Sequence, residues 1–573
     1  MKKGRTYLGI VNRVDFPNKG KVTMTKLLED TTENGGEVFS DVTEEDRKIT
    51  VVVKGVLPGQ TVRFRIIKVH LSKNKAEGML LKVEKPSDDE TEAACPMAGN
   101  CGGCSYQTLP YEKQLAMKEA MVKKLMDAVI KTPYSFLPIR RGPLAFRYRN
   151  KMEYTFGDEY KDGPLSLGMH KKGSFYDVLT NDCCVIVHED YNLILRTVLE
   201  AAQKTGYRYY HKIRHEGYFR NLVIRRAQKT GEILIHLVTS SEHPEGENDF
   251  LTGLTEKLVR LETEGKIVGI IHSRNSQLSD AVNSDETSVL YGQDYFYEEL
   301  LGLRFKITPF SFFQTNSLGA EVLYSTVREM IGDTKDKLVF DLYSGTGTIA
   351  QIAAPVAKKV IGVEIVAEAV EAAKKNALGN GLSNCEFLAG DVLKVIDTIP
   401  DTPDIIVLDP PREGIVPKAL EKIIAYGVDK LVYISCNPLS LQRDLAVFAE
   451  NDYHVEKVCP VDMFPGTVHV ETVCLLSKLH EAKHHVSVTL DMDEMDLTSA
   501  ESKATYEEIK KYVAEHNDGM KVSSLNIAQV KRKCGIELGE NHNLPKSEDA
   551  RQPQCPKEKE DAIVEALKAF QMI

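Results

Sequence analysis

Three side chains able to do covalent chemistry follow apolar segments in the second half of this sequence. Cys436 follows the strand-like run LVYIS and precedes Asn437 and Pro438, Asp409 ends IIVL, and Glu471 lies in MFPGTVHVETV. A lone cysteine is usually a small buried hydrophobe. Here it stands between an apolar strand and an Asn-Pro turn, which is a poor place for a core residue. We interpret the three side chains as a nucleophile, a polarising group and a base.

This set matches what methylation of a pyrimidine carbon requires. C5 of uracil is too weak a nucleophile to attack a sulfonium methyl group. A thiolate that adds to C6 turns the ring into an enolate whose C5 takes the methyl, and a base then removes the C5 proton so that the thiol is expelled. A free cysteine is only a few per cent thiolate at neutral pH. The site must raise that fraction or deprotonate Cys436 as it attacks.

A glycine-rich turn predicts a nucleotide-like ligand on the same sheet. DLYSGTGT (341–348) follows the strand LVF, and Gly345 and Gly347 let the backbone approach a ligand closely. Glu364 ends the next strand, where an acid suits a ribose hydroxyl pair, and Asp391 follows the third strand, facing the adenine. The run GTGTIA also satisfies a dinucleotide pattern, so a nicotinamide cofactor or a merely structural turn are the alternatives to a methyl donor.

A cluster of cysteines predicts a metal site. Cys95, Cys101 and Cys104 form C-x5-C-x2-C, and Cys183 or Cys184 supplies a fourth thiolate. Spacing alone slightly favours zinc over an iron–sulfur cluster. Radical methyltransferases also combine a cluster with S-adenosylmethionine, but their three cysteines have x3 and x2 spacing and leave one iron open. Four cysteines imply a closed cluster.

The order of elements predicts an α/β protein with a doubly wound, parallel methyltransferase-like sheet. Short strands broken by Gly and Pro at 1–85 indicate a small barrel, 93–308 a central mixed α+β domain, and 309–480 strands alternating with helices. Residues 481–573 turn polar and acidic with helical periodicity, which predicts a helical extension of unknown role.

Composition narrows the cellular setting. No apolar run approaches the roughly 20 residues that cross a bilayer, and the N-terminus turns polar too soon for a signal peptide. We expect a cytoplasmic monomer. The net charge of −10 argues against a nucleic-acid partner, but basic runs with aromatics at 140–151 and 217–226 favour RNA locally.

Five motifs in one order carry a family resemblance. SFFQTN, DLYSGTG, LDPPREG, YISCNP and MFPGTVHVE resemble the uracil-5-methyltransferase family of RNA-modifying enzymes over roughly residues 1–478. The resemblance implies that Cys436 is the nucleophile and Glu471 the base. It also implies that these residues contact S-adenosylmethionine: Gln314, Tyr343, Thr348, Glu364, Asp391 and Asp409. Thr348 departs from the Asn or similar residue of some members.

The same resemblance extends to the N-terminal half. CGGCxxQ followed by a distant cysteine is similar to the [4Fe–4S] site of the ribosomal-RNA members, with the ligands Cys95, Cys101, Cys104 and Cys183. Residues 1–85 resemble a TRAM domain, an RNA-binding barrel. Both features imply 23S ribosomal RNA with a flipped loop uridine as substrate. Alternatives are a transfer-RNA methyltransferase, a radical enzyme, or an RNA-binding module with a degenerate fold, against which the intact catalytic pair argues.

Overall fold

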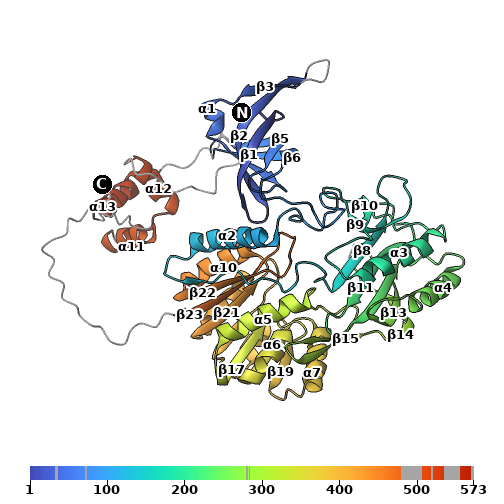
Figure 1. The fold of residues 1–573 in the computed structure, drawn as a ribbon. Coiled ribbons are helices and arrows are strands. Elements are labelled where there is room, and N and C mark those ends of the chain that lie inside the picture. Colours follow the sequence, from blue (N-terminus) through green and yellow to red (C-terminus); the bar gives the residue numbers. More distant parts are fainter. Residues whose placement is uncertain are drawn as a thin grey trace. The chain divides into compact units, whose positions relative to one another are not determined.

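The computed structural model describes residues 1–31, 37–70, 72, 74–278, 282, 284–478, 506–517, 520–533 and 555–569. The chain forms two compact units, residues 1–481 and 482–573 (Figure 1). The predicted subdivision of the first unit into domains stays a prediction. Much of the predicted extension at 481–573 lies outside the described residues.

The N-terminal strands form a closed ring. Each strand of the ring pairs with two others in the order β1-β5-β6-β4-β2, and β2 pairs back onto β1. Alternate residues of β1 and β5 point inward, which places Tyr7, Phe64 and other apolar side chains in one core. The strands are β1 (Thr6–Asp15), β2 (Lys19–Thr31), β3 (Glu37–Asp41), which extends β2, β4 (Thr50–Lys54), β5 (Thr61–His70) and β6 (Lys75–Lys85).

A seven-stranded sheet of order β10-β9-β8-β11-β12-β13-β14 follows. Helices α3 (Glu189–Gln203) and α4 (Glu247–Val259) cover one face, and their apolar residues share a core with that face. The strands are β8 (Lys151–Gly157), β9 (Ser166–His170), β10 (Val178–Thr180), β11 (Phe219–Arg226), β12 (Glu232–Thr239), β13 (Lys266–Arg274) and β14 (Glu286–Gly292). A hairpin of β15 (Phe296–Leu300) and β16 (Leu303–Ile307) leads out of it.

An eight-stranded sheet carries the predicted methyltransferase motifs. Its order is β19-β18-β17-β20-β21-β23-β22-β7, and the strands β17 to β21 are parallel to one another. The strands are β7 (Ser135–Phe136), β17 (Thr334–Leu342), β18 (Ala357–Glu364), β19 (Cys385–Ala389), β20 (Ile405–Leu408), β21 (Lys430–Ser435), β22 (Tyr453–Val461) and β23 (Glu471–Lys478). The class I methyltransferase type of α/β sheet is therefore present.

Both faces of this sheet are buried, which is why its strands read as continuous apolar runs such as IIVL. One core holds Leu342, Leu408 and Tyr433, and the other holds Val339, Val407 and Ile434. The helices are α2 (Tyr111–Val129), α8 (Val392–Val395), α9 (Pro417–Ala425) and α10 (Pro438–Ala449) on the first face, and α5 (Ser317–Ile331), α6 (Thr348–Ala353) and α7 (Ala367–Gly379) on the second.

Strand β23 runs against its neighbours. It pairs antiparallel with both β21 and β22, so β21 and β22 run in the same direction and β23 runs against them. The chain reaches β23 from β22 through the loop 462–470 without a crossover helix, and such a short connection reverses the chain. The prediction of a parallel sheet is therefore incomplete at this edge, and the exception matters for the site.

The second unit contains three helices among its described residues: α11 (Tyr506–His516), α12 (Ser524–Lys533) and α13 (Lys557–Ala569). Each contributes apolar residues to a small core that includes Ile509, Ile527 and Ile563.

Candidate active site

Cys436 occupies a turn between a strand and a helix. Strand β21 ends at Ser435, and Asn437 caps α10 by accepting a hydrogen bond from the Leu439 amide at 3.2 Å. Pro438 at the first helical position needs no amide partner there. The Asn-Pro pair of the motif is thus explained by helix initiation, and it leaves Cys436 half-buried at the strand end.

The reversed strand brings Glu471 to the same place. Ser435 of β21 pairs with Thr472 of β23, and Ile434 pairs with Val473. One further step of this antiparallel register sets Cys436 opposite Glu471, and directly opposed residues share a face. If β23 ran parallel to β21, its first residue, Glu471, would lie beside the start of β21 and far from Cys436.

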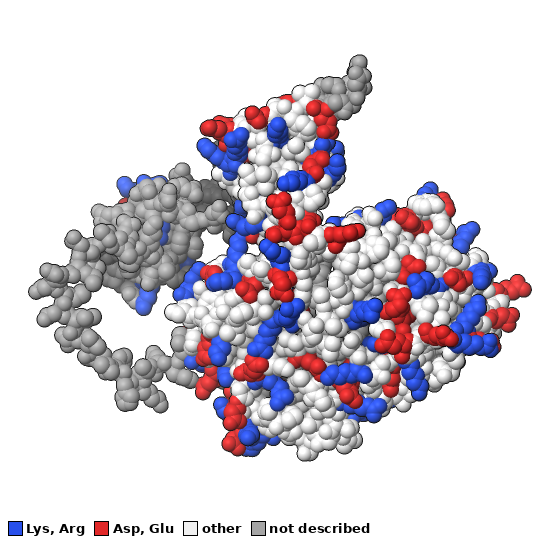
Figure 2. Space-filling model, viewed as in Figure 1, with Lys and Arg blue, Asp and Glu red and all other residues white. Residues whose placement is uncertain are grey.

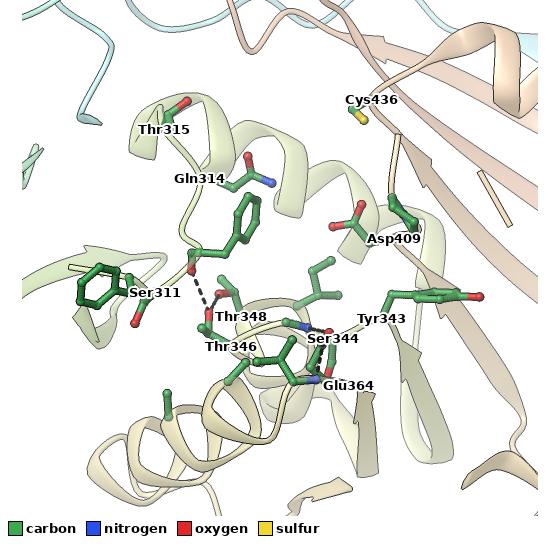
Figure 3. A pocket seen from close by; sticks show the side chains of 18 of the residues that line it. Ser311, Gln314, Thr315, Tyr343, Ser344, Thr346, Thr348, Glu364, Asp409 and Cys436 are labelled. Carbon is green, nitrogen blue, oxygen red and sulfur yellow. Dashed lines mark hydrogen bonds between the residues drawn. The ribbon is translucent and has the colours of Figure 1, made fainter. Parts of the chain in front are cut away.

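A cavity of about 1710 Å³ joins this pair to the glycine-rich turn. That volume exceeds what one drug-sized ligand needs, so the cavity has room for two. Seven predicted site residues line it: Gln314, Tyr343, Thr348, Glu364, Asp409, Cys436 and Glu471. Figure 3 shows Gln314 and Asp409 pointing into one space, with Cys436 beyond it and the threonines of the turn on the other side.

Asp391 is the predicted donor contact that does not line the cavity. It caps α8, and its carboxylate accepts a hydrogen bond from the Leu393 amide at 3.0 Å. It lies close enough to Tyr343 to raise the pKa of that phenol, after burial, which is the larger cause. The structure thus shows Asp391 as a helix cap, and its contact with the methyl donor stays a prediction.

The glycine-rich turn has two glycines with different tasks. Both have left-handed backbones, with φ of 54° at Gly345 and 72° at Gly347. A Cβ on Gly347 would lie 2.5 Å from the Phe387 ring, so packing excludes a side chain there, whereas a Cβ on Gly345 would meet nothing within 4 Å. The Gly345 amide donates to Glu364 at 2.9 Å. The open space beside Gly345 is therefore the part available to a ligand.

The loop that carries Gln314 is held from the neighbouring sheet. Asn150 donates to the Gln314 carbonyl at 3.0 Å, and the buried Arg225 donates to the carbonyls of Pro309 and Ser311 at 3.0 and 2.8 Å. Arg225 belongs to the basic run 217–226 that was expected to favour RNA, but its side chain is buried and bonds to these carbonyls instead. Asn150 matches none of the five motifs.

Burial and like charge keep the acids of the cavity protonated to unusually high pH. Burial, then Asp409, raises the pKa of Glu471 to about 8, and burial raises the pKa of Asp409 to about 7. Burial, Glu471 and Asp409 together raise the pKa of Cys436 to about 11. Arg412 acts in the opposite direction on Cys436 and Glu471.

Three contacts hold Arg412 near Cys436 and Glu471. Asn437 and Ser440 donate to its carbonyl at 3.1 and 3.2 Å, and its guanidinium lies 3.2 Å from Nδ1 of His469. Burial, followed by Arg412, lowers the pKa of His469 to about 4. The imidazole is neutral at physiological pH, so its Nδ1 accepts the hydrogen bond.

The predicted metal ligands Cys95, Cys101, Cys104 and Cys183 are all half-buried free thiols. Burial raises the pKa values of Cys101, Cys104, Cys183 and Cys184, and the Cys95 thiol adds to the effect at each of them. Cys95 therefore lies near both candidates for the fourth ligand. Within the described ranges, no group of three or more His, Cys, Asp or Glu side chains is arranged to hold a metal ion.

Among the helices described, none is long and apolar enough to span a membrane.

Comparison with known proteins assigns the class. Residues 231–479 match the family model for tRNA (uracil-5-)-methyltransferase. The chain is 47% identical over 474 residues to an uncharacterised RNA methyltransferase of Clostridium tetani, covering 82% of this chain and 98% of that one. A relative of Clostridium acetobutylicum with the same description is 50% identical over 429 residues, covering 75% and 92%.

A solved structure shares the fold. The tRNA (uracil-54, C5)-methyltransferase of Pyrococcus abyssi, solved with S-adenosyl-L-homocysteine, superposes with a TM-score of 0.60 at 23% identity, over 82% of this chain and all of that one. Sheet, cavity and relatives together define an RNA methyltransferase. The chain belongs to the RNA uracil-5-methyltransferase family.

Proposed function

We propose that this enzyme transfers the methyl group of S-adenosylmethionine to C5 of a uridine in RNA through a covalent bond between Cys436 and C6. The observation that carries this proposal is that Cys436 and Glu471 line one cavity next to the paired residues Ser435 and Thr472 of two adjacent strands. The donor binds at the other end, beside Gly345 and Glu364. The binding of S-adenosyl-L-homocysteine by the Pyrococcus abyssi protein, which shares the fold, supports this choice of donor.

The reaction has three balanced steps. Cys436 loses its proton to solvent, the thiolate adds to C6, and the ring electrons move to give an enolate. C5 then attacks the methyl carbon, the carbon–sulfur bond of the donor breaks, and S-adenosylhomocysteine leaves. Glu471 finally takes the C5 proton, the C5–C6 double bond reforms, and the thiolate departs.

At neutral pH the free protein holds Cys436 as a thiol and Glu471 mostly as a protonated carboxyl, since their pKa values are about 11 and 8. Attack at C6 needs the thiolate and removal of the C5 proton needs the carboxylate, so both groups must lose a proton to solvent before they act. The positive Arg412 is the group that favours both deprotonated forms. Once ionised, a carboxyl with a raised pKa is a stronger base for the C5 proton.

Substituting the two residues separately tests the order. Cys436→Ala should form neither covalent adduct nor methylated RNA. Glu471→Gln should still add and methylate but stall before elimination, giving a denaturation-resistant protein–RNA band that carries the labelled methyl. A Glu471→Gln protein that binds RNA and donor without forming that band would refute the late role of Glu471.

For the substrate we propose 23S ribosomal RNA. The barrel of residues 1–85, a TRAM-like RNA-binding module, and the cysteine cluster support this choice. Transfer RNA is the second candidate, because the matching family model and the Pyrococcus abyssi protein carry transfer-RNA names. Incubating the protein with each purified RNA and labelled donor, followed by nucleoside analysis, distinguishes them: label in transfer RNA alone would exclude the first choice.

We further propose that Cys95, Cys101, Cys104 and Cys183 hold a [4Fe–4S] cluster. The four side chains are half-buried free thiols, which is the ligand type that such a cluster requires, although the structure does not arrange them as a metal site. The amides of Gly103 and Asn181 also point at the Cys101 sulfur, at 3.4 and 3.8 Å, as hydrogen-bond donors do around cluster ligands. When bound, the cluster would cross-link residues 95–104 to Cys183. No step of methyl transfer uses it.

Metal content of protein purified without oxygen tests this site. About four irons per chain and a brown colour are expected, and Cys183→Ser should lose them. Cys184→Ser is the matched control, because Cys184 is buried in the apolar core beside α3. Stoichiometric zinc in place of iron would show that the site is a zinc site. Loss of metal only in the Cys184→Ser protein would show that Cys184 is the fourth ligand.

A further inference from the structure

Two adjoining loops of the seven-stranded sheet expose apolar side chains among basic ones. Phe175, Tyr176 and Ile213 have 75%, 58% and 65% of their surface exposed. The first two lie in the loop between β9 and β10, and Ile213 lies in the segment between α3 and β11. We call this surface the aromatic strip, and its residues are Lys171, Lys172, Phe175, Tyr176, Lys212, Ile213 and Arg214.

The strip is built on closed turns rather than on loose chain. Lys171 donates its amide to Asp177 at 2.9 Å, and Ser174 accepts the Asp177 amide at 3.1 Å. The two loops touch each other, because Nζ of Lys212 lies 5.7 Å from the centroid of the Phe175 ring. The rings of Phe175 and Tyr176 stand edge to face at 6.2 Å. Exposed rings held this firmly are suited to a partner that stacks on them.

The strip continues from the rim of the active-site cavity. Met169 and Gly103 line the cavity, and the residues beside them pair: the Gly102 amide donates to the His170 carbonyl at 3.0 Å, and Cys101 forms a bridge with Lys171. At the other side, Cε of Lys172 lies 3.8 Å from where a Cβ on Gly55 of the barrel would stand. A chain leaving the cavity can therefore pass along the strip toward the barrel.

The chemistry of the strip identifies the partner. The four charged residues of the strip are basic, and Asp177 and Glu216 of the same two loops lie next to it in the sequence. Lys, Arg, Asp and Glu are interspersed over the face of the molecule shown in Figure 2. Basic groups with stackable rings between them are the pattern that binds single-stranded nucleic acid, since phosphates meet the cations and bases stack on the rings. A purely apolar protein partner would remove water from the four cations without providing opposite charges, and this desolvation costs free energy.

We propose that the aromatic strip binds a single-stranded segment of the substrate RNA next to the target uridine. Bases stack on Phe175 and Tyr176, and phosphates lie near Lys171, Lys172 and Arg214. The inference rests on the proposed function for the identity of the substrate, but it assigns a binding surface outside the cavity. Recognition of flanking nucleotides would then help to select one uridine among many.

Binding and methylation of two RNAs by the full chain test the proposal. One RNA is a minimal hairpin with the target uridine, and the other carries unpaired nucleotides on both sides of it. Phe175→Ala/Tyr176→Ala should weaken binding of the flanked RNA roughly tenfold or more, measured by fluorescence anisotropy. Its KM should rise similarly with kcat unchanged, and the hairpin should behave as with the wild type. Both side chains are exposed, so the fold should persist.

Two further variants sharpen the result. Tyr291→Ala is the matched control, because this exposed tyrosine lies on β14 at the opposite edge of the same sheet. Lys171→Gln/Lys172→Gln should reduce the slope of log affinity against log salt by about 1.4, or about 0.7 for each lost phosphate contact. Unchanged affinity of the Phe175→Ala/Tyr176→Ala protein for flanked RNA would overturn the proposal and leave the strip to a protein partner. Because anisotropy needs no methyl transfer, this failure is distinct from failure of the proposed function.

Discussion

At the scale of single residues, the cavity surrounds the Cys436 sulfur with groups that oppose its ionisation. Burial, followed by the carboxyls of Glu471 and Asp409, raises the pKa of Cys436 to about 11, and the guanidinium of Arg412 acts in the opposite direction. In the free protein this keeps the sulfur as an unreactive thiol. Activation of Cys436 therefore depends on how far Arg412 and the bound substrate lower the pKa of the thiol against the effect of Glu471 and Asp409.

This balance predicts how fast an alkylating reagent labels Cys436. At about pH 9 Glu471 is ionised, since its pKa is about 8, and its charge raises the pKa of the thiol. Glu471→Gln should then label several-fold faster than the wild type, because the thiolate fraction rises about tenfold for each unit by which the pKa falls. Arg412→Gln should label more slowly. Rates come from mass spectrometry of the Cys436 peptide after timed iodoacetamide treatment.

At about pH 6, where Glu471 is protonated in the wild type, the advantage of Glu471→Gln should disappear. Equal rates for all three proteins at the higher pH would mean that these charges do not control the sulfur.

At the scale of elements, the loop that precedes Glu471 is anchored by helix α2 and the segment after Cys104. Gln114 of α2 accepts the Gly466 amide at 2.7 Å, and the amides of Ser105 and Tyr106 donate to the Gly466 carbonyl at 2.9 Å. Tyr148 donates to the carbonyl of Pro465 at 2.9 Å. Residues far apart in the sequence thus set the position of Glu471.

The strongest anchor is a buried ion pair. Lys118 of α2 lies 2.7 Å from Asp462, with 1% and 0% of their side chains exposed, and it also donates to the Phe464 carbonyl at 3.0 Å. Lys118→Met should lower the free energy of unfolding by about 3–5 kcal/mol, because it leaves a buried carboxylate uncompensated. Urea unfolding followed by circular dichroism measures the change.

Lys123 of the same helix provides the matched control. It pairs with Asp127 at 2.9 Å, but about half of each side chain is exposed, so Lys123→Met should change the stability by less than about 1 kcal/mol. Adding Asp462→Asn to Lys118→Met should restore part of the loss, since the amide carries no charge. A Lys118→Met protein as stable as the control would show that the pair contributes little.

At the scale of the whole molecule, the methyltransferase motifs belong to one compact unit. The seven site residues that line the cavity all lie in the unit of residues 1–481. The helices of the second unit have a core of their own. Each unit therefore has what it needs to fold separately.

Deleting residues 482–573 should leave methyl transfer to a minimal RNA hairpin unchanged, because the cavity and its supports remain. Initial rates of label transfer by the truncated and full-length proteins provide the measurement, with circular dichroism and donor binding as checks on folding. Loss of activity in a truncated protein that still folds and binds donor would show that the second unit completes the site.

The family and the layout of most strands could be predicted from the sequence alone, and the chemistry of the site stays a prediction. Residue types such as Cys436, Glu364 and the glycines of the turn follow apolar runs, and a strand end at a sheet edge is where a ligand binds in this class of fold. Local patterns of this kind are legible because they depend on backbone conformation and burial within a few residues.

Which residues meet, and what their charges become, depends on the folded chain. The antiparallel direction of β23, which places Glu471 near Cys436, and the helix cap formed by Asp391 depend on chain connection and capping geometry. The support from Asn150, Arg225 and Lys118 comes from residues more than eighty positions away in the sequence. Such contacts have no local signal, because they arise from the packing of whole elements against one another.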